Sequence, residues 1–303
     1  NITFTSEGIL NGLLDFNIVL VTLQIIVTLF GLLGNILALI VLSKETARST
    51  RVFLLKTLAC SDSLFLISVV IFYIPWMGEY QGLWNLDISY NTKYTELVVI
   101  TVVSTTDILT TWVVVLTTVD RYIYIAKPLE ATTISTPKRM KIGVGFLTII
   151  AILYNISRAI FYFDSTIKMT YGVIFQVVFR HAGPMITVSV LNVKLVQSVR
   201  KSRRHVEQLT DIESEARKQT LTIIAIVSVF FLSTLVSLEY LIVSVTNWYN
   251  FTNISREVKS INRLIANFWI ICNSSCNFIF YFLFGKTFRK EFKKIILCKL
   301  ATT

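Results

Sequence analysis

Seven long apolar runs constrain this chain more than any other feature of its sequence. They lie at about residues 18–42, 53–76, 95–125, 142–163, 171–198, 219–246 and 259–284. Each is close to or above the roughly 20 residues that an α-helix needs to cross a bilayer. The links between them are short, and no internal repeat or low-complexity segment interrupts them. The sequence therefore predicts an all-α membrane protein whose spans form one seven-transmembrane helix bundle.

The composition supports a membrane protein. Hydrophobic residues make up 54% of the 303 positions and charged residues only 16%, and the mean hydropathy is +0.66. A soluble surface needs more charge than this. We expect three parts in the chain: an extracellular N-terminus (1–17), a transmembrane domain (18–284), and an amphipathic helix with a cytoplasmic tail (285–303).

The expected C-terminal helix has one apolar face. Four residues share that face at helical spacing: Phe288, Phe292, Ile295 and Ile296. Lysines and arginines cover the rest of the segment. This pattern is typical of a helix that lies on the membrane surface, in contact with membrane lipid.

The distribution of basic residues predicts the orientation. Of the 29 Lys and Arg residues, 22 fall in the first, third and fifth links and the tail, counted with the adjoining helix ends. By the positive-inside rule this side is cytoplasmic, so the N-terminus lies outside a plasma membrane that the chain crosses several times. The net charge of +11 then indicates attraction to the inner leaflet and no nucleic-acid partner, although any one basic run could be a topology signal alone. The sequons at Asn1, Asn250 and Asn253 fall outside and predict glycosylation.

Residues for catalysis or metal binding are missing from the sequence pattern. The four cysteines give no loop-borne disulfide framework, and the two histidines form no ligand cluster. There is no Gly-rich phosphate loop and no nucleophile elbow. We therefore expect neither an enzyme nor a metal site. Cys298, just beyond the amphipathic helix, is either a palmitoylation site or an inert thiol.

The run at 95–125 carries ionisable residues that are rare inside a membrane. Asp107 lies in its interior, and Asp120 and Arg121 lie near its cytoplasmic end. Such groups cost free energy in hydrocarbon, so a helix that keeps them indicates a functional use. For Arg121 taken alone, a snorkelling anchor is the other interpretation.

Several short motifs, in order and spacing, resemble the signature positions of rhodopsin-like (class A) G-protein-coupled receptors. They are Gly34-Asn35, Leu58-Ala59-Cys60-Ser61-Asp62, Asp120-Arg121-Tyr122, Pro184 and Asn277-Phe278-Ile279-Phe280-Tyr281. The closing run from Asn273 to Tyr281 is similar to invertebrate FMRFamide-type neuropeptide receptors, in which Asn-Phe commonly replaces Asn-Pro. The resemblance covers nearly the whole chain.

The resemblance implies roles for two groups of residues. The expected switch and G-protein-coupling residues are Asp120, Arg121, Tyr122, Asn277 and Tyr281. A second group is expected to form a water-filled polar cluster that can hold a sodium ion, or only a structural hydrogen-bond network: Asn35, Asp62, Thr110 and Asn273. Beyond that ion no cofactor is expected.

The sequence also departs from the family pattern. The family's disulfide-forming cysteine at the outer end of the third span falls on Glu96, and no extracellular link contains a cysteine. Thr234 and Val236 replace the usual Trp and Pro of the sixth span, and the seventh span has no proline. Since prolines kink such helices, we expect any hinge to lie elsewhere.

The ligand pocket is expected in the outer half of the bundle. The family position for an amine-binding Asp falls on Val103 and that for a retinal-binding Lys on Ile271, so neither chemistry is supported. With Val103 itself, the candidate ligand contacts are Glu96, Asp107, Arg180, Glu239 and Arg263, beside His181 and the aromatic run 161–163. A short amidated peptide would suit such a wall.

Asp107 permits a more specific expectation. It lies 14 residues before Arg121 and therefore on nearly the same face, about 21 Å along the helix. Either Asp107 pairs with Arg180, or it receives a cationic group of the ligand. The overall prediction is a peptide-activated receptor that couples to a heterotrimeric G protein. A small-molecule chemosensory or orphan receptor is the alternative, with a transporter or channel less favoured because no inverted repeat is evident.

Overall fold

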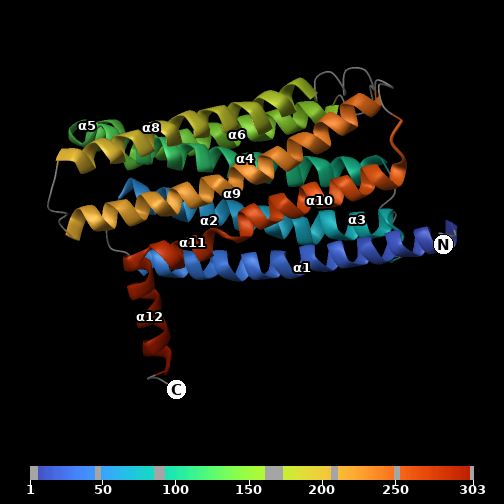
Figure 1. Ribbon diagram of the computed structural model, residues 1–303, viewed down its shortest axis with the longest axis horizontal. Helices are drawn as coiled ribbons and strands as arrows, with labels where there is room; N and C mark the ends of the chain where they lie inside the picture. The colour runs from blue at the N-terminus through green and yellow to red at the C-terminus, as the bar shows by residue number, and fades with distance from the viewer. Residues whose placement is uncertain are drawn as a thin grey trace.

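The computed structural model describes residues 6–44, 49–84, 93–160, 173–205, 211–248 and 253–300. Within these ranges, seven helical stretches are long and apolar enough to cross a membrane, and no β-strand is present. Figure 1 shows them side by side in one elongated bundle, with the last helix projecting from one end. The predicted all-α seven-helix bundle is confirmed.

The spans begin and end as follows. They are α1 (Ser6–Lys44), α2 (Thr50–Ser68) continued by η1 (Val69–Tyr73) and α3 (Ile74–Tyr80), α4 (Lys93–Ala126), α6 (Pro137–Ile160), η3 (Gln176–Ala182) continued by α8 (Gly183–His205), α9 (Asp211–Trp248), and α10 (Arg256–Ser275) continued by α11 (Asn277–Phe284). A short helix, α5 (Pro128–Ile134), follows α4, and α12 (Lys286–Leu300) ends the described chain. We call the end with α5 and α12 the inner end and the opposite end the outer end, after the predicted orientation.

Several helices extend beyond the apolar runs. α1 begins at Ser6, although its apolar run begins at about residue 18, and α9 begins at Asp211, eight residues before its run. An apolar run marks the part of a helix that hydrocarbon can surround, whereas the helix itself continues wherever its backbone hydrogen bonds can. Helix ends therefore cannot be obtained from hydropathy alone.

Irregular helix turns occur in three spans. The π-helical segments η1 and η3 end shortly before Pro75 and Pro184, whose rings remove an N–H donor and widen the preceding turn. The seventh span breaks at Cys276, between α10 and α11, although it has no proline. The sixth span, α9, is continuous. The irregular turns therefore lie in the second, fifth and seventh spans, which agrees with the expectation that any hinge lies outside the sixth span.

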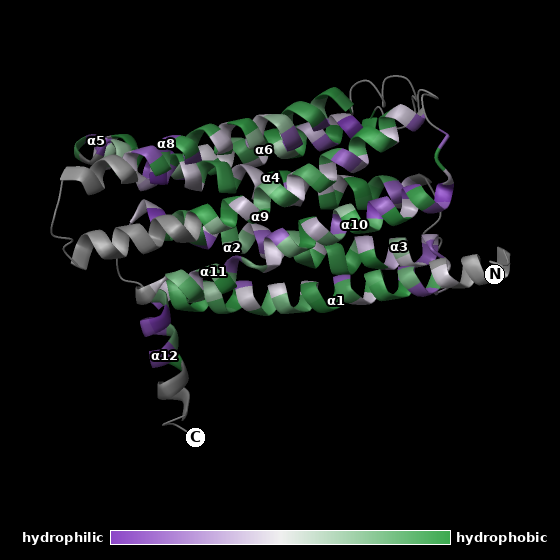
Figure 2. Ribbon diagram, in the orientation of Figure 1, coloured by the Kyte–Doolittle hydropathy of each residue, from purple (hydrophilic) through white to green (hydrophobic). Residues whose placement is uncertain are grey.

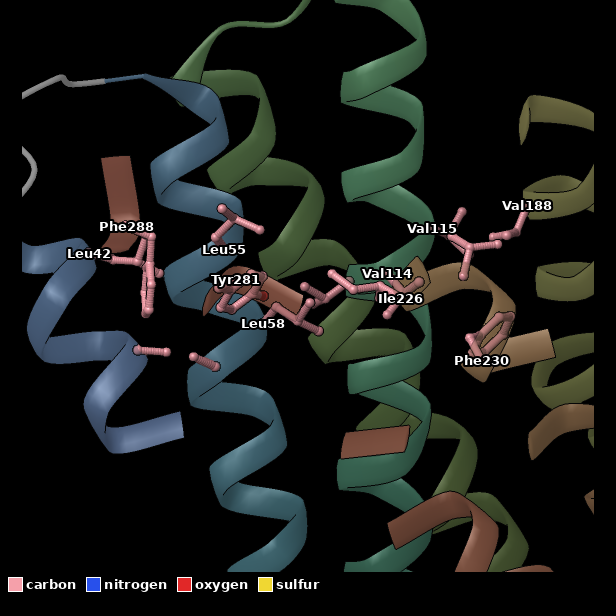
Figure 3. Close-up of a cluster of buried hydrophobic side chains, with 14 of the residues drawn as sticks. Leu42, Leu55, Leu58, Val114, Val115, Val188, Ile226, Phe230, Tyr281 and Phe288 are labelled. Atoms are coloured by element: carbon pink, nitrogen blue, oxygen red, sulfur yellow. The ribbon is translucent and has the colours of Figure 1, made fainter. Parts of the chain in front are cut away.

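The interior contains apolar clusters at both ends of the bundle. Figure 3 shows the inner one, where Tyr281 and Phe288 approach Leu42, Leu55 and Leu58. The outer cluster joins α1, the second span, α4 and α10. Figure 2 shows apolar residues along the spans, and many on the outside, such as Leu33 of α1 at 58% exposure, face outward. A bundle with apolar residues both inside and outside suits a bilayer.

The apolar face predicted for the C-terminal helix forms as expected. Phe288 is buried, and Phe292 and Ile295 pack against the inner cluster. The rings of Phe288 and Phe292 each lie 5.8 Å from the ring of Phe278 on α11. This face therefore anchors α12 to the bundle, while its contact with a lipid surface stays a prediction. The side chain of Ile296 is outside the described set.

Candidate functional site

The inner end of α4 carries the first group of candidate residues. Asp120 is fully buried, and its Oδ2 accepts hydrogen bonds from Nε of Arg121, at 3.1 Å, and from Nη2. Its Oδ1 accepts a hydrogen bond from the hydroxyl of Ser135, in the connection between α5 and α6. The backbone oxygen of Ser135 accepts a bond of 3.0 Å from the hydroxyl of Thr50 on α2. Asp120 therefore fixes Arg121 and is itself tied to a loop and to a second helix.

Tyr122 and Tyr281 of the predicted coupling group differ in burial. The guanidinium of Arg121 stacks on Tyr124, 5.2 Å from the ring centroid, whereas Tyr122 is half-buried. Tyr281 is buried in the inner apolar cluster, and its hydroxyl has no hydrogen-bond partner. A buried hydroxyl without a partner is costly in this state and can gain a bond in another.

The predicted polar cluster forms in part. The amide of Asn277 donates to Oδ2 of Asp62 at 2.6 Å, and the amide of Asn35 donates to the backbone oxygen of Ser274 at 3.0 Å. The hydroxyl of Thr110 lies beside the Asp62 carboxylate without reaching a hydrogen-bond partner. Asn273, by contrast, lines the cavity around Asp107. The family resemblance had placed Asn273 in the polar cluster.

The polar cluster has unused hydrogen-bonding capacity. Five buried oxygen atoms have no partner: Oδ1 of Asn35, Oδ1 of Asp62, Oδ1 of Asn277 and the hydroxyls of Thr110 and Ser275. Such groups are normally satisfied by a partner or an ordered water. Gly31 permits this close packing, since a Cβ there would overlap the Ser275 side chain.

The outer half of the bundle contains an ion pair between two spans, in which Asp107 is buried and Arg180 is half-buried. Nε of Arg180 on η3 lies 2.7 Å from Oδ2 of Asp107 on α4. Beside it, the indole N–H of Trp112 donates to the backbone oxygen of Phe179 at 3.0 Å, so α4 and η3 are joined twice. Asp107 was expected either to pair with Arg180 or to receive a cationic group of the ligand, and the structure shows the pair with Arg180.

A small polar cavity adjoins this ion pair. Its volume is about 20 Å³, enough for about one water molecule. The lining residues other than the pair are Thr111, His181, Phe230, Ser233, Thr234, Ser237, Ile270 and Asn273. His181 is buried and its Nδ1 has no partner. In this state the cavity has room for a small polar group but no room for a peptide side chain.

The remaining predicted ligand contacts lie further out. The guanidinium of Arg263 on α10 packs among aromatic rings, and its Nε donates a hydrogen bond of 2.9 Å to the Tyr240 hydroxyl. Exposed Glu239 accepts a bond from Asn262. Glu96 is half-buried in the first turn of α4, and Val103 packs against the outer apolar cluster.

Comparisons with known proteins identify the family. A family model described as the 7 transmembrane receptor (rhodopsin family) matches residues 34–281. The chain belongs to this family. The matched range includes both Asp–Arg pairs and the polar cluster.

Individual relatives are similar over most of this chain. The Drosophila melanogaster FMRFamide receptor is 25% identical over 88% of this chain and 52% of its own length. The Drosophila melanogaster sex peptide receptor is 24% identical over 89% and 70%, and the Danio rerio galanin receptor 2a is 24% identical over 89% and 76%. The chain thus spans about half the length of the FMRFamide receptor.

Some predicted positions lie outside the description. Asn1, Asn250 and the aromatic run 161–163 are not among the described residues. Asn253 is exposed immediately before α10, as a glycan acceptor must be. Cys298 was expected just beyond the C-terminal helix, but α12 continues to Leu300 and includes it, and its side chain is outside the described set.

Sequence reasoning missed several residues of these sites. Ser135 and Thr50 were not foreseen, although Ser135-Thr136-Pro137 is typical of a helix start and could have placed Ser135 at the end of α5. The amide of Gln24 on α1 donates to the backbone oxygen of Leu264 at 2.9 Å and was also missed. The aromatic residues around Arg263 come from two other helices, and no local pattern links them.

Proposed function

We propose that this chain is a plasma-membrane receptor, with its N-terminus outside, that binds a short amidated peptide and activates a heterotrimeric G protein. The observation that carries the proposal is that α4 contributes a buried aspartate to an Asp–Arg pair in each half of the bundle, with Arg121 of α4 itself at the inner end and Arg180 of η3 in the outer half. The names of the similar receptors, which refer to FMRFamide, sex peptide and galanin, support a peptide ligand.

The outer pair suits recognition of a cationic ligand group. Asp107 is a buried carboxylate whose single described ion-pair partner is Arg180. A ligand guanidinium could share or replace this partner, and either change would alter the contact between α4 and η3. Because the cavity is small, agonist binding requires the outer ends of the spans to separate first.

The inner pair suits control of a G-protein site. Arg121 is held by Asp120, which is held in turn by Ser135. Release of Arg121 would free a charged group at the inner end of α4, where a G protein would bind. Agonist and G protein would then favour the same state, which is the thermodynamic basis of receptor activation.

The polar cluster fits a sodium ion. The carboxylate of Asp62 and the neighbouring amide and hydroxyl oxygens are the hard donors that such an ion prefers, and several of them have no protein partner. When bound, the ion would supply a positive charge that stabilises the Asp62 carboxylate. The proposal therefore includes a bound sodium ion. It also includes three surface features of the receptor: lipid contact at α12, a palmitoyl group on Cys298, and glycans at Asn1, Asn250 and Asn253.

A small-molecule ligand is the second candidate. It is favoured by the volume of the Asp107 cavity, which at about 20 Å³ matches a small polar group better than a peptide side chain. A receptor for a small cation would use the same Asp107 carboxylate without Glu96, Glu239 and Arg263, which lie further out. Peptide and small-molecule panels therefore discriminate the two candidates.

The test is a second-messenger screen in cells that express the full chain. Amidated peptides that end in Arg-Phe-amide should produce a dose-dependent response, and the same cells with Arg121→Ala should not respond. A response to small cations alone would favour the second candidate. No response to any peptide, with receptor demonstrated at the surface, would contradict the proposal.

A further inference from the structure

A second cavity opens above the Asp107 cavity, at the outer end of the bundle. Its volume is about 250 Å³, many times that of the Asp107 cavity. Its lining residues are Tyr80 of α3 and Arg256, Lys259, Ser260 and Arg263 of α10. Three of the five are basic and none is acidic, so the cavity has a strongly positive wall.

Helix geometry directs these basic residues to one side. Arg256, Lys259 and Arg263 are spaced three and four residues apart, so they lie within about 60° of one another around α10. The N-terminus of the 20-residue helix α10 lies at the same place, and its dipole adds to the positive field. None of the three forms an ion pair with a described carboxylate, and the nearby Glu257 and Glu239 are exposed.

Arg263 is held in place by groups that carry no charge. The centroids of the Trp76, Tyr80 and Tyr240 rings lie 5.5, 5.7 and 5.9 Å from its guanidinium carbon. Aromatic rings and one phenol oxygen restrain the side chain but leave its charge without a counter-ion. A restrained guanidinium without a carboxylate partner is well prepared to bind one.

Ser260 links this wall to the rest of the bundle. Its hydroxyl accepts a hydrogen bond from the amide of Gln81, whose own oxygen accepts one from the amide of Asn17, at 3.1 Å, on α1. The wall is therefore fixed by contacts from α1, from the second span and from α9. A site that is fixed before binding loses little conformational entropy when a ligand binds.

The distance between the two cavities limits what could span them. Arg263 precedes Ile270, which lines the Asp107 cavity, by seven residues on the same face of α10. This separation corresponds to about 10 Å along the helix, which is about three residues of extended peptide. One peptide could therefore place a cation at Asp107 and an anion at Arg263.

We propose that the Arg256, Lys259 and Arg263 wall binds a carboxylate side chain of the peptide ligand, located a few residues N-terminal to its cationic end. This inference rests on the proposed peptide-receptor function and adds a second, opposite charge to the ligand. The ligand is then a peptide with an acidic residue, a short spacer and an Arg-Phe-amide end.

Direct binding tests the inference without reference to signalling. The probes are labelled peptides that end in Arg-Phe-amide and carry one Glu at two to five residues before the Arg, each with a Gln twin. The full chain is purified into nanodiscs of zwitterionic lipid, and affinity is measured by fluorescence anisotropy. At the best position the Glu peptide should bind about tenfold more tightly than its Gln twin, and the ratio should fall with added salt.

Variants assign the effect to the wall. Arg263→Gln should reduce the Glu/Gln ratio to about one. Lys259→Gln, which keeps the aromatic contacts of Arg263 intact, should reduce the ratio by about a factor of three. Asn262→Ala is the matched control, because Asn262 lies on the same helix turn and contacts Glu239, and it should leave the ratio unchanged.

Three results would overturn the inference: equal binding of Glu and Gln peptides at every position, a preference that survives both basic-residue substitutions, or no measurable binding of either peptide. These outcomes are separate from a failure of the proposed function. Activation by neutral amidated peptides with a ratio of one would leave the function intact and remove the carboxylate site. Tighter binding of the Glu peptide without any G-protein response would support the carboxylate site and contradict the proposed function.

Discussion

The two Asp–Arg pairs that involve α4 have the same composition but connect different parts of the molecule. The outer pair, Asp107 and Arg180, joins two spans whose residues are far apart in sequence. The inner pair, Asp120 and Arg121, joins adjacent residues of one helix and so cannot hold two helices together. That task falls to Ser135, which binds the other oxygen of Asp120. The comparison teaches that the outer pair is an interhelical contact that a ligand can alter, whereas the inner pair restrains one side chain.

The largest effect should come from removing the inner cation. Arg121 is charged at every accessible pH, and it is the only member of the inner pair that can contact an incoming G protein with a positive charge. Arg121→Ala should abolish agonist-stimulated G-protein activation and leave surface expression nearly unchanged. Surface labelling and nucleotide-exchange measurements on the same cells check this. Unchanged coupling would show that the inner pair has no part in signalling.

Breaking the outer pair should have the next largest effect. Asp107→Asn leaves the half-buried Arg180 without a counter-ion, and broken charge pairs at interfaces cost about 2–5 kcal/mol when they are fully buried. Agonist potency should fall by at least about tenfold, which corresponds to about 1.4 kcal/mol.

A matched peptide separates recognition from structural support at Asp107. An agonist whose Arg is replaced by a neutral residue should lose potency on the wild type but little further on Asp107→Asn. In addition, Arg180→Gln should recover part of the thermal stability that Asp107→Asn loses, because it removes the unpaired charge. Equal losses for the neutral agonist on both receptors would show that the ligand cation and Asp107 do not meet.

Loosening the inner pair without removing the cation should have a smaller effect of opposite sign. Asp120→Asn weakens the hold on Arg121 and should raise ligand-independent signalling. Ser135→Ala removes one hydrogen bond, worth about 0.5–1.5 kcal/mol, and should raise basal signalling about two- to tenfold. Basal second-messenger levels at matched surface expression measure both, and lowered basal signalling in either variant would contradict the restraint.

The smallest effect concerns disulfides. The described cysteines Cys60, Cys272 and Cys276 are free thiols within the spans, and no extracellular link contains a cysteine in the sequence. Ligand binding should therefore be unchanged by a mild reducing agent, since no outer bond exists to break. A receptor of the family with an outer cysteine pair serves as the control, and loss of binding here would indicate an unrecognised partner thiol.

Sequence reasoning located the helices better than the contacts between them. The apolar runs, and the shared helix face of Asp107 and Arg121, follow from the spacing of residues within a single helix, so they can be predicted from the sequence. Arg180 was named as the partner of Asp107 because few charged residues lie at that depth. Ser135 and the aromatic rings around Arg263 could not be obtained in this way, because their positions depend on how separate elements pack. The break at Cys276 was missed because it needs no proline.

The most direct test of the account uses the reciprocity between the two ends of α4. If agonist and G protein favour the same state, each must raise the affinity of the other by the same factor. Agonist affinity for the purified full chain in nanodiscs should therefore increase at least about fivefold when a heterotrimeric G protein is added, as a typical coupling energy implies. In Arg121→Ala the increase should disappear while the affinity without G protein stays unchanged. An agonist affinity that is indifferent to G protein in the wild type, or that responds equally in Arg121→Ala, would contradict the account.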